Sequence, residues 1–309
     1  MSSSTRQANM LLAMFALAGL ASCAPPPTLP SMSKGFSTGY TVSYSTGNSA
    51  VCVSGKVPVS FSATNTKLLL NNPPDQYTAS EIIAELFQND ATLPITTNGG
   101  PKAVSGTYNI AATLCYPASL DAAKKVTTLQ VLTHGVSLEK SYWDIASNYS
   151  YVDAAAKAGY ATLAYDRLGV GGSDHPDPIQ IVQAYTDVEI LHGIVQLIRN
   201  AQVGSFAPKN IVGVGHSFGS IIQLAVNGKY PNDLDASVIT GFAANADYLP
   251  MTVFANNPAI AKFENPSKWG SLATGYLVNN APISVMLPFF RYPSYSPASK
   301  FSLLLQRRP

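Results

Sequence analysis

Charged residues are scarce in this sequence. Asp, Glu, Lys and Arg make up 12% of its 309 residues, and the formal net charge at pH 7 is +2. The basic pairs Lys124-Lys125 and Arg307-Arg308 are isolated and form no basic stripe. Nucleic-acid binding needs clustered positive charge to pair with phosphates. We therefore expect no nucleic-acid partner, and no feature of the sequence specifies an oligomeric state.

Long apolar runs are also rare, and the clearest one lies near the start of the chain. Residues 10–20 read MLLAMFALAGL, follow the basic Arg6, and precede a PPP run that no helix can continue. Because the apolar run is short for a bilayer span, we predict a signal peptide over residues 1–23, no stable membrane span, and a secreted, extracellular protein. Two alternatives stay open: a single membrane anchor and, in a bacterial chain, a lipid on Cys23 of the LASC sequence.

Cysteine is the third scarcity, with three residues in the whole chain. No CxxC or HxxxH spacing occurs, so we expect no metal site. Beyond the signal, Cys52 and Cys115 remain as an even pair in an exported chain, which favours a disulfide over two buried free thiols. The acceptor sequence Asn148-Tyr149-Ser150 places Asn148 at the surface if the host attaches glycans.

The first part of the exported chain predicts a linker and then antiparallel strands. Residues 24–46 are rich in Pro, Ser, Thr and Gly, which is typical of a linker with little structure of its own. Residues 50–63 and 106–116 alternate polar and β-branched or aromatic side chains and predict strands. Residues 77–87 predict a short helix between them. These segments would begin the sheet in antiparallel fashion.

From residue 126 the pattern changes to short apolar strands that alternate with helices. The strands are expected at residues 126–133, 161–165, 210–214 and 236–242. This alternation predicts an α/β fold with a mostly parallel sheet, right-handed crossovers and helices on both faces.

The domain organisation follows from these segments. We predict an α/β core over residues 47–247. A cap or lid follows over residues 248–300, after the fourth parallel strand, and residues 301–309 form an irregular tail.

The strongest chemical signal is Gly215-His216-Ser217-Phe218-Gly219, between a predicted buried strand and a predicted helix. It matches G-x-S-x-G, in which a sharp strand-to-helix turn exposes a strained serine hydroxyl. Gly215 and Gly219 remove side chains that would collide at this turn, and the helix start directs N–H groups and partial positive charge towards the reacting oxygen. The motif predicts that Ser217 is a nucleophile, and the alternative is a glycine-rich turn without chemistry.

Two further motifs follow the first two buried strands. His134-Gly135-Val136 is typical of a loop that supplies one oxyanion donor, so we predict that Val136 N–H and Phe218 N–H form the oxyanion hole. For His134 we favour a structural role in ordering the loop. The run Asp166–Ser173 (DRLGVGGS) lacks the G-K-[ST] ending of a phosphate loop and predicts a structural loop beside the site.

Together these segments resemble the α/β-hydrolase superfamily and, more narrowly, are similar to secreted fungal esterase- or lipase-like members. The matching pieces, GTYNIAATLCYP, LTHGVSLEKSYWD, GYATLAYDRLGVGGSDHP and IVGVGHSFGS, span about residues 104–247 in the same order. The resemblance implies the α/β-hydrolase fold, a small-molecule ester or acyl substrate, hydrolysis without a cofactor, and the chain order nucleophile, acid, histidine.

The sequence departs from this order after Ser217, because all four of its histidines precede that residue. His216 is adjacent to the nucleophile and should point away, and His192 lies on a predicted apolar helix face. His175 is the substitute base that stays open. Asp247 follows the fourth parallel strand and is the acid candidate at the correct edge of the sheet.

Two expectations follow about the chain end and the function. Since residues 301–309 are too few for the two strand–helix units that should follow the cap, we expect an incomplete C-terminal part and a sheet edge prone to aggregation. We expect a secreted serine hydrolase acting on carboxylic esters or related acyl groups, inactive if the missing histidine is essential. The alternative is a non-catalytic relative that binds a hydrophobic ligand or partner under the cap, and both suit the cap residues Val285, Leu287, Phe289 and Phe290.

Overall fold

The computed structural model describes residues 32–88, 92–204, 206–245, 247, 249–291 and 293. The predicted signal peptide with Cys23, the first part of the predicted linker and the tail at residues 301–309 lie outside the described residues, as do the side chains of Val285 and Leu287. Within the described ranges, no helix combines the length and the apolar character needed to cross a membrane.

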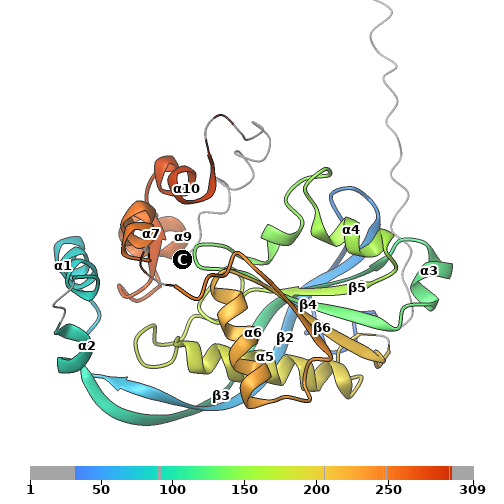
Figure 1. Cartoon of the computed structure of the whole chain (residues 1–309), viewed down its shortest axis with the longest axis horizontal. Helices are drawn as coiled ribbons and strands as arrows, with labels where there is room; N and C mark the ends of the chain where they lie inside the picture. The colour runs from blue at the N-terminus through green and yellow to red at the C-terminus, as the bar shows by residue number, and fades with distance from the viewer. Residues whose placement is uncertain are drawn as a thin grey trace, which may run out of the picture.

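A seven-stranded sheet with the order β1-β2-β3-β5-β4-β6-β7 forms the centre of the molecule (Figure 1). Its strands are β1 (Thr41–Tyr44), β2 (Ala50–Leu68), β3 (Asn98–Pro117), β4 (Thr128–Thr133), β5 (Ala161–Tyr165), β6 (Asn210–His216) and β7 (Ala236–Thr240). The pairs from β1 to β5 are antiparallel, whereas β5, β4, β6 and β7 run parallel. The predicted combination of an antiparallel start and a parallel continuation is confirmed.

Strand β1 corrects the prediction that residues 24–46 form only a linker. Thr41 to Tyr44 pair with Ser54 to Val51 of β2. Val42 and Tyr44 pack against the main hydrophobic core. These alternate positions face the same side of the strand, so apolar burial on one face stabilises β1 despite its polar surroundings.

Helices cover both faces of the sheet, as predicted. On one face, α5 (Ala184–Arg199) and α6 (Phe218–Lys229) pack on strand residues that include Val131. On the other, α4 (Tyr151–Lys157) and the 3-10 helix η1 (Lys140–Trp143) pack on a second cluster that includes Leu132. Because helices pack on both faces, the central parallel strands β4 and β5 are buried along almost their whole length. A short helix, α3 (Leu120–Lys124), joins β3 to β4.

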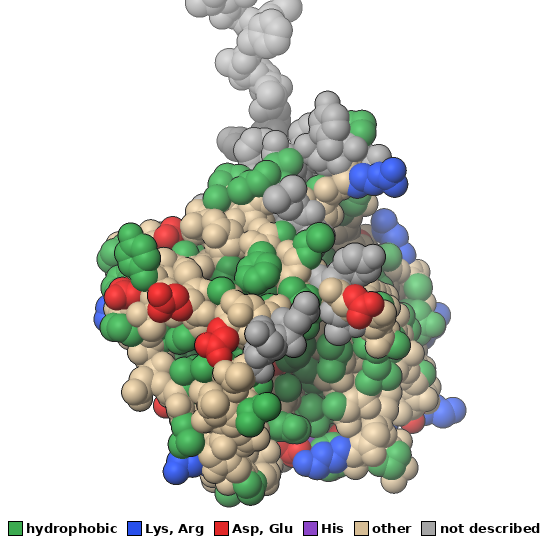
Figure 2. All heavy atoms as spheres, turned by 60° about the vertical axis from the view of Figure 1, so that its left-hand side comes forward, with side chains coloured by type: hydrophobic (Ala, Val, Ile, Leu, Met, Phe, Trp, Pro, Cys, Tyr) green, Lys and Arg blue, Asp and Glu red, His purple; other side chains and the backbone are tan. Residues whose placement is uncertain are grey.

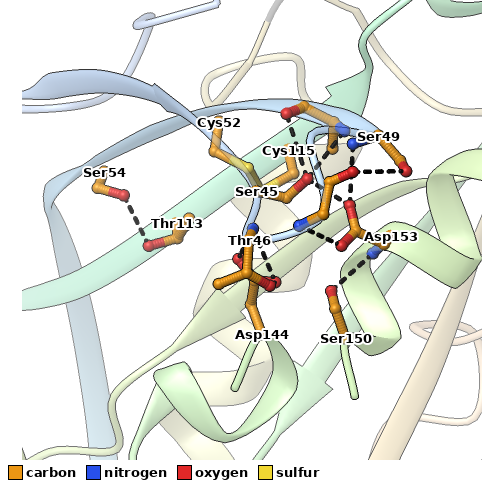
Figure 3. The surroundings of a disulfide bond; sticks show 12 residues. Ser45, Thr46, Ser49, Cys52, Ser54, Thr113, Cys115, Asp144, Ser150 and Asp153 are labelled. Atoms are coloured by element: carbon orange, nitrogen blue, oxygen red, sulfur yellow. Dashed lines mark hydrogen bonds between the residues drawn. A yellow bond between two sulfur atoms is a disulfide. The ribbon is translucent and has the colours of Figure 1, made fainter. Parts of the chain in front are cut away.

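A disulfide joins Cys52 of β2 to Cys115 of β3, which are directly opposite in the register, with an S–S distance of 2.03 Å (Figure 3). Beside it, Asp153 of α4 accepts hydrogen bonds from Ser45 Oγ (2.5 Å) and Ser49 N–H (3.0 Å) (Figure 3). Burial would raise the pKa of Asp153, but these and neighbouring hydrogen bonds outweigh it and lower the pKa. The carboxylate therefore fastens α4 to the β1–β2 turn.

Strands β2 and β3 extend beyond the sheet as a long arm that carries α1 (Gln76–Leu86) and α2 (Leu93–Thr96). In Figure 1 these two helices stand beside the segment that follows β7. We call this segment the cap. It consists of α7 (Leu249–Asn256), β8 (Pro258–Ile260), α8 (Ala261–Glu264), α9 (Pro266–Trp269), β9 (Leu277–Asn279) and α10 (Pro282–Phe289). Strands β8 and β9 pair antiparallel.

The outer strand β7 is more exposed than the other parallel strands. Its central residue Val238 is 44% exposed, and Ile221 and Leu224 of the adjacent helix α6 are also exposed. In the part of the chain that the structure describes, no strand pairs with the outer side of β7. Elsewhere on the surface, Asn148 of the glycosylation sequence is exposed.

Candidate active site

Ser217 occupies a strained turn between β6 and α6. Its backbone has φ 54° and ψ −118°, a conformation that non-glycine residues rarely adopt. The turn is fixed from the neighbouring strand β7, because Ser217 N–H donates to Thr240 O at 2.9 Å. Ser220 Oγ also donates to Thr240 O, at 2.8 Å. The predicted elbow geometry is therefore present at Ser217.

Three glycines allow the chain to pass close to this turn. A Cβ on Gly215 would lie 2.7 Å from Ser220 N, and one on Gly219 would collide with Thr133 O. A Cβ on Gly135 would lie 3.0 Å from Ser217 Cβ and 3.5 Å from Ser217 Oγ. The role of Gly135 is not predicted by the G-x-S-x-G motif. It shows that the loop after β4 lies directly against Ser217.

His134 holds this loop in place. Its side chain is fully buried, its Nδ1 lies 2.8 Å from Gly135 O, and its Nε2 accepts from Arg167 N–H at 3.1 Å. These two partners require a neutral ring that carries its proton on Nδ1. Burial, with a smaller contribution from the positive charge of Arg167, lowers the pKa of His134 to about 3. The ring thus connects the loop after β4 to the loop after β5.

Arg167 links both sides of the proposed oxyanion hole. Its backbone holds His134, and its guanidinium lies 4.9 Å from the centre of the Phe218 ring, with Nη1 donating to Asp187 at 2.8 Å. Arg167 is 8% exposed, so this ion pair is largely removed from water. Burial raises the pKa of Asp187, although Arg167 opposes the shift. The sequence predicts only a structural loop at residues 166–173. Through Arg167, this loop also holds the side chain of Phe218, the residue after Ser217.

The two proposed oxyanion donors lie at the elbow and on the loop beside it. Phe218 is the first residue of α6, so its N–H has no partner within the helix and points with the positive end of the helix dipole. Val136 follows Gly135, and its side chain is 54% exposed into the adjoining cavity. An oxygen that gains negative charge beside Ser217 would find stabilisation here.

We call the loop after β4, which carries Gly135, Val136 and Ser137, the proposed oxyanion loop. A cavity of about 290 Å³ lies between this loop, the loop after β5, the arm and the cap. Most of its lining is apolar, and polar groups come from four residues. The lining residues are Ile83, Val136, Ser137, Leu138, Arg167, Val170, Val253, Asn256, Pro258, Leu277, Val278 and Asn279. Such a lining suits an apolar group with one polar end.

A polar contact fastens the cap to the oxyanion loop at the edge of this cavity. Ser137 Oγ donates towards Asn279 Oδ1 (3.2 Å) or Asn256 Oδ1 (3.3 Å), and Asn279 Nδ2 donates to Asn256 Oδ1 (3.1 Å). Asn256 and Asn279 are buried cap residues, while Ser137 has φ 61°. The position of the cap and the shape of the oxyanion loop are therefore coupled.

None of the other three histidines forms a hydrogen bond with Ser217 among the described residues. His216 stacks on Tyr142, with ring centres 4.9 Å apart, and burial lowers its pKa. His192 bonds to Asp233 at 2.7 Å. Because Asp233 precedes β7, whereas Ser217 follows β6, this pair lies at the opposite edge of the sheet.

His175, the substitute base that the sequence left open, is not brought to Ser217. The residue before it, Asp174, is bonded through its N–H to Asn109 O at 3.0 Å, which holds this part of the loop beside β3. Two strands, β5 and β4, separate β3 from β6. At the usual strand spacing this separation is about 14 Å. The ring of His175 instead contacts Tyr276 of the cap, with centres 5.2 Å apart.

Asp247, the acid candidate, is exposed and pairs locally. Its Oδ2 accepts from Asn245 Nδ2 at 2.8 Å, and its N–H donates to Asn245 Oδ1 at 2.6 Å. No histidine is among its partners in the described ranges. Those ranges also contain no group of three or more His, Cys, Asp or Glu side chains that could hold a metal ion.

A strained serine at a strand-to-helix turn, with a glycine loop from a neighbouring parallel strand against it, defines the α/β-hydrolase class. The chain belongs to the alpha/beta hydrolase family, whose model matches residues 130–306. No curated protein matches the chain significantly.

Solved structures that match part of the chain include hydrolases of two kinds. A mutant epoxide hydrolase from Vigna radiata is 18% identical, with 43% of this chain and 35% of that one covered and a TM-score of 0.33. Epoxide hydrolase A from Mycobacterium thermoresistibile is 18% identical, with 51% and 46% covered and a TM-score of 0.34. A thermophilic esterase from Thermogutta terrifontis is 14% identical, with 52% and 53% covered and a TM-score of 0.35. The chain thus spans about a third to a half of the length of these structures.

Proposed function

We propose that this protein is a secreted serine hydrolase that cleaves carboxylic esters or related acyl substrates with Ser217 as its nucleophile. The observation that carries the proposal is the strained backbone of Ser217, with φ 54° and ψ −118°, at the start of α6 and against Gly135. A strained, glycine-lined serine turn has a destabilising cost that is expected where the hydroxyl must react. The apolar cavity that Val136 lines, on the same loop as Gly135, fits an acyl group.

In the proposed reaction, Ser217 Oγ attacks the carbonyl carbon of the ester while a general base takes its proton. The bond between the carbonyl carbon and the alcohol oxygen then breaks, the alcohol leaves with that proton, and the acyl group stays on Ser217. Water releases the acid by the same steps and restores the serine. The N–H groups of Val136 and Phe218 hold the negative oxygen in both halves, and no cofactor is required.

Export is supported by two independent features. The apolar run at residues 10–20 is typical of a signal peptide. The Cys52–Cys115 disulfide is typical of proteins that mature in an oxidising compartment. In a bacterial chain, the alternative to release is anchoring to the membrane through a lipid on Cys23.

A second function is favoured by one specific observation. No histidine ring in the described ranges is hydrogen-bonded to Ser217. The cavity of about 290 Å³ would hold a hydrophobic ligand without any reaction. The alternative is therefore a non-catalytic member of the family that binds such a ligand beneath the cap.

Hydrolysis of p-nitrophenyl acetate, butyrate and octanoate by the purified chain and by Ser217→Ala separates these functions. Turnover that disappears in Ser217→Ala supports the hydrolase. Binding of octanoate without turnover of any ester by a folded chain supports the ligand-binding alternative and overturns the hydrolase.

A further inference from the structure

Helix α1 belongs to the arm but lies against the cap. The β2–β3 hairpin pairs from Ala50–Pro117 out to Leu68–Asn98, and the described residues 69–88 and 92–97 lie at its tip. Figure 2 brings this side of the molecule forward and shows many hydrophobic side chains at the surface. Only Ala79 of α1 is buried, so specific contacts rather than a core of its own hold the helix.

The first of these contacts comes from Gln76, at the start of α1. Gln76 Nε2 donates to Pro258 O at 3.1 Å, and Gln76 Oε1 accepts from Ile260 N–H at 2.8 Å. Both backbone groups belong to β8, whose other side pairs with β9. One side-chain amide therefore satisfies the donor and the acceptor that a neighbouring strand would satisfy. A second contact is made before the helix, where Asn72 Oδ1 accepts from Gly275 N–H at 3.1 Å.

The same face of α1 reaches the cavity. Gln76, Ile83 and Phe87 are spaced by seven and four residues, so they lie along one side of the helix. Phe87 meets Phe254 of α7 edge to face, with ring centres 6.1 Å apart. Ile83, between the two anchoring contacts, is the residue of the arm that lines the cavity within the described ranges. Its neighbour Ile82 is turned away by about 100° and does not line it.

From these contacts we infer that α1, in addition to the cap, forms a wall of the acyl-binding cavity, which we call the second wall. We further infer that Ile83 limits the length of acyl chain that the enzyme accepts. Gln76 is the positioning residue that holds this wall against the cap. The substrate class follows from the lining. Ile83, Val253, Leu277 and Val278 present only hydrocarbon to the acyl chain, so straight saturated chains are accepted up to the length that meets Ile83. This inference rests on the proposed acyl hydrolysis.

The test compares Ile83→Trp with Ile82→Trp, a matched control on the same helix. kcat/KM is measured for p-nitrophenyl esters from acetate to dodecanoate. Ile83→Trp should lower the ratio of octanoate to acetate kcat/KM by about tenfold or more, as removal of space from an apolar pocket does. Ile82→Trp should leave the ratio unchanged. Ile83→Ala should move the optimum to longer chains, which keeps the test decisive if the tryptophan variant does not fold.

Binding of octanoate, measured by calorimetry, separates failure of this inference from failure of the proposed function. If the wild-type chain hydrolyses esters but Ile83→Trp and Ile82→Trp give the same ratio, Ile83 does not limit chain length and the inference is overturned. If no ester is hydrolysed but Ile83→Trp alone weakens octanoate binding, the proposed reaction fails and the second wall stands. Gln76→Leu should reduce the preference between chain lengths, and an unchanged preference would show that Gln76 does not position α1.

Discussion

The strain at Ser217 predicts that glycine is more stabilising than alanine at this position, whereas glycine is usually the less stabilising of the two. Neither Ser217→Ala nor Ser217→Gly keeps the hydroxyl, so the two variants differ only by the Cβ. At φ 54° and ψ −118°, that Cβ is strained, whereas glycine adopts this region freely. The glycine variant should therefore be the more stable of the two.

The magnitude follows from two opposing contributions. A non-glycine residue in such a region costs about 1–3 kcal/mol. Glycine loses about 0.5–1 kcal/mol relative to alanine through the greater freedom of the unfolded chain. The difference leaves Ser217→Gly more stable than Ser217→Ala by about 1 kcal/mol, which corresponds to roughly 1–2 °C in Tm for a chain of 309 residues.

Urea unfolding followed by circular dichroism measures this difference, and calorimetry gives the Tm. A matched control is Ala225→Gly, at an exposed position of α6, which should lose about 1 kcal/mol because its backbone is an ordinary helix. Equal stability of the two Ser217 variants, or greater stability of Ser217→Ala, would refute the reasoning that the turn is strained.

Three further predictions concern the loop, its histidine and the disulfide. Gly135→Ala places a methyl group 3.5 Å from Ser217 Oγ, so ester kcat/KM should fall about 100-fold, and an unchanged value would contradict the close approach. The pKa of His134 is lowered to about 3 in the folded state, so the unfolded chain binds more protons between that pH and about 6.5. Stability should therefore rise with pH across this window, by up to about 1.4 kcal/mol per unit from this group, and urea unfolding at pH 4.5 and 7 should show a weaker dependence in His134→Asn. Replacement of both Cys52 and Cys115 by serine opens a link across 63 residues and should cost about 4 kcal/mol in urea unfolding at constant pH, whereas a loss below about 1 kcal/mol would show that the bond does not constrain the unfolded chain.

Features with a strong local signal were predictable from the sequence. Strands β4 and β5 consist mainly of apolar and β-branched residues because they are buried on both faces. The elbow was predictable because only glycines fit on both sides of Ser217. The fold that these elements form, and the family, are confirmed by the sheet order and the match over residues 130–306.

Features that depend on distant contacts were not predictable. Strand β1 has four residues and is stabilised by pairing with β2, so its glycine- and serine-rich surroundings outweighed its short alternating pattern. The contact between Gln76 and Ile260 joins residues 184 positions apart and has no periodic signature. The same holds for the contact of Arg167 with Phe218, which joins the loop after β5 to the first residue of α6.

The acid and base remained beyond sequence reasoning for a related reason. His175 and Asp247 were selected because each lies on a loop that follows a parallel strand, but their contacts are with Tyr276 and Asn245. Chain order fixes the edge of the sheet at which a loop emerges. It does not fix the position along that edge, which depends on bonds such as that between Asp174 and Asn109.

The central claim is tested most directly by covalent labelling of Ser217 with a fluorophosphonate, in which serine displaces fluoride from phosphorus. The account predicts one label per folded chain, located by mass spectrometry on the peptide that contains Ser217. Ser217→Ala should abolish the label, and Ser62→Ala, on the exposed side of β2, should retain it. A folded chain that takes up no label, or that is labelled equally after Ser217→Ala, would contradict the assignment of Ser217 as an activated nucleophile.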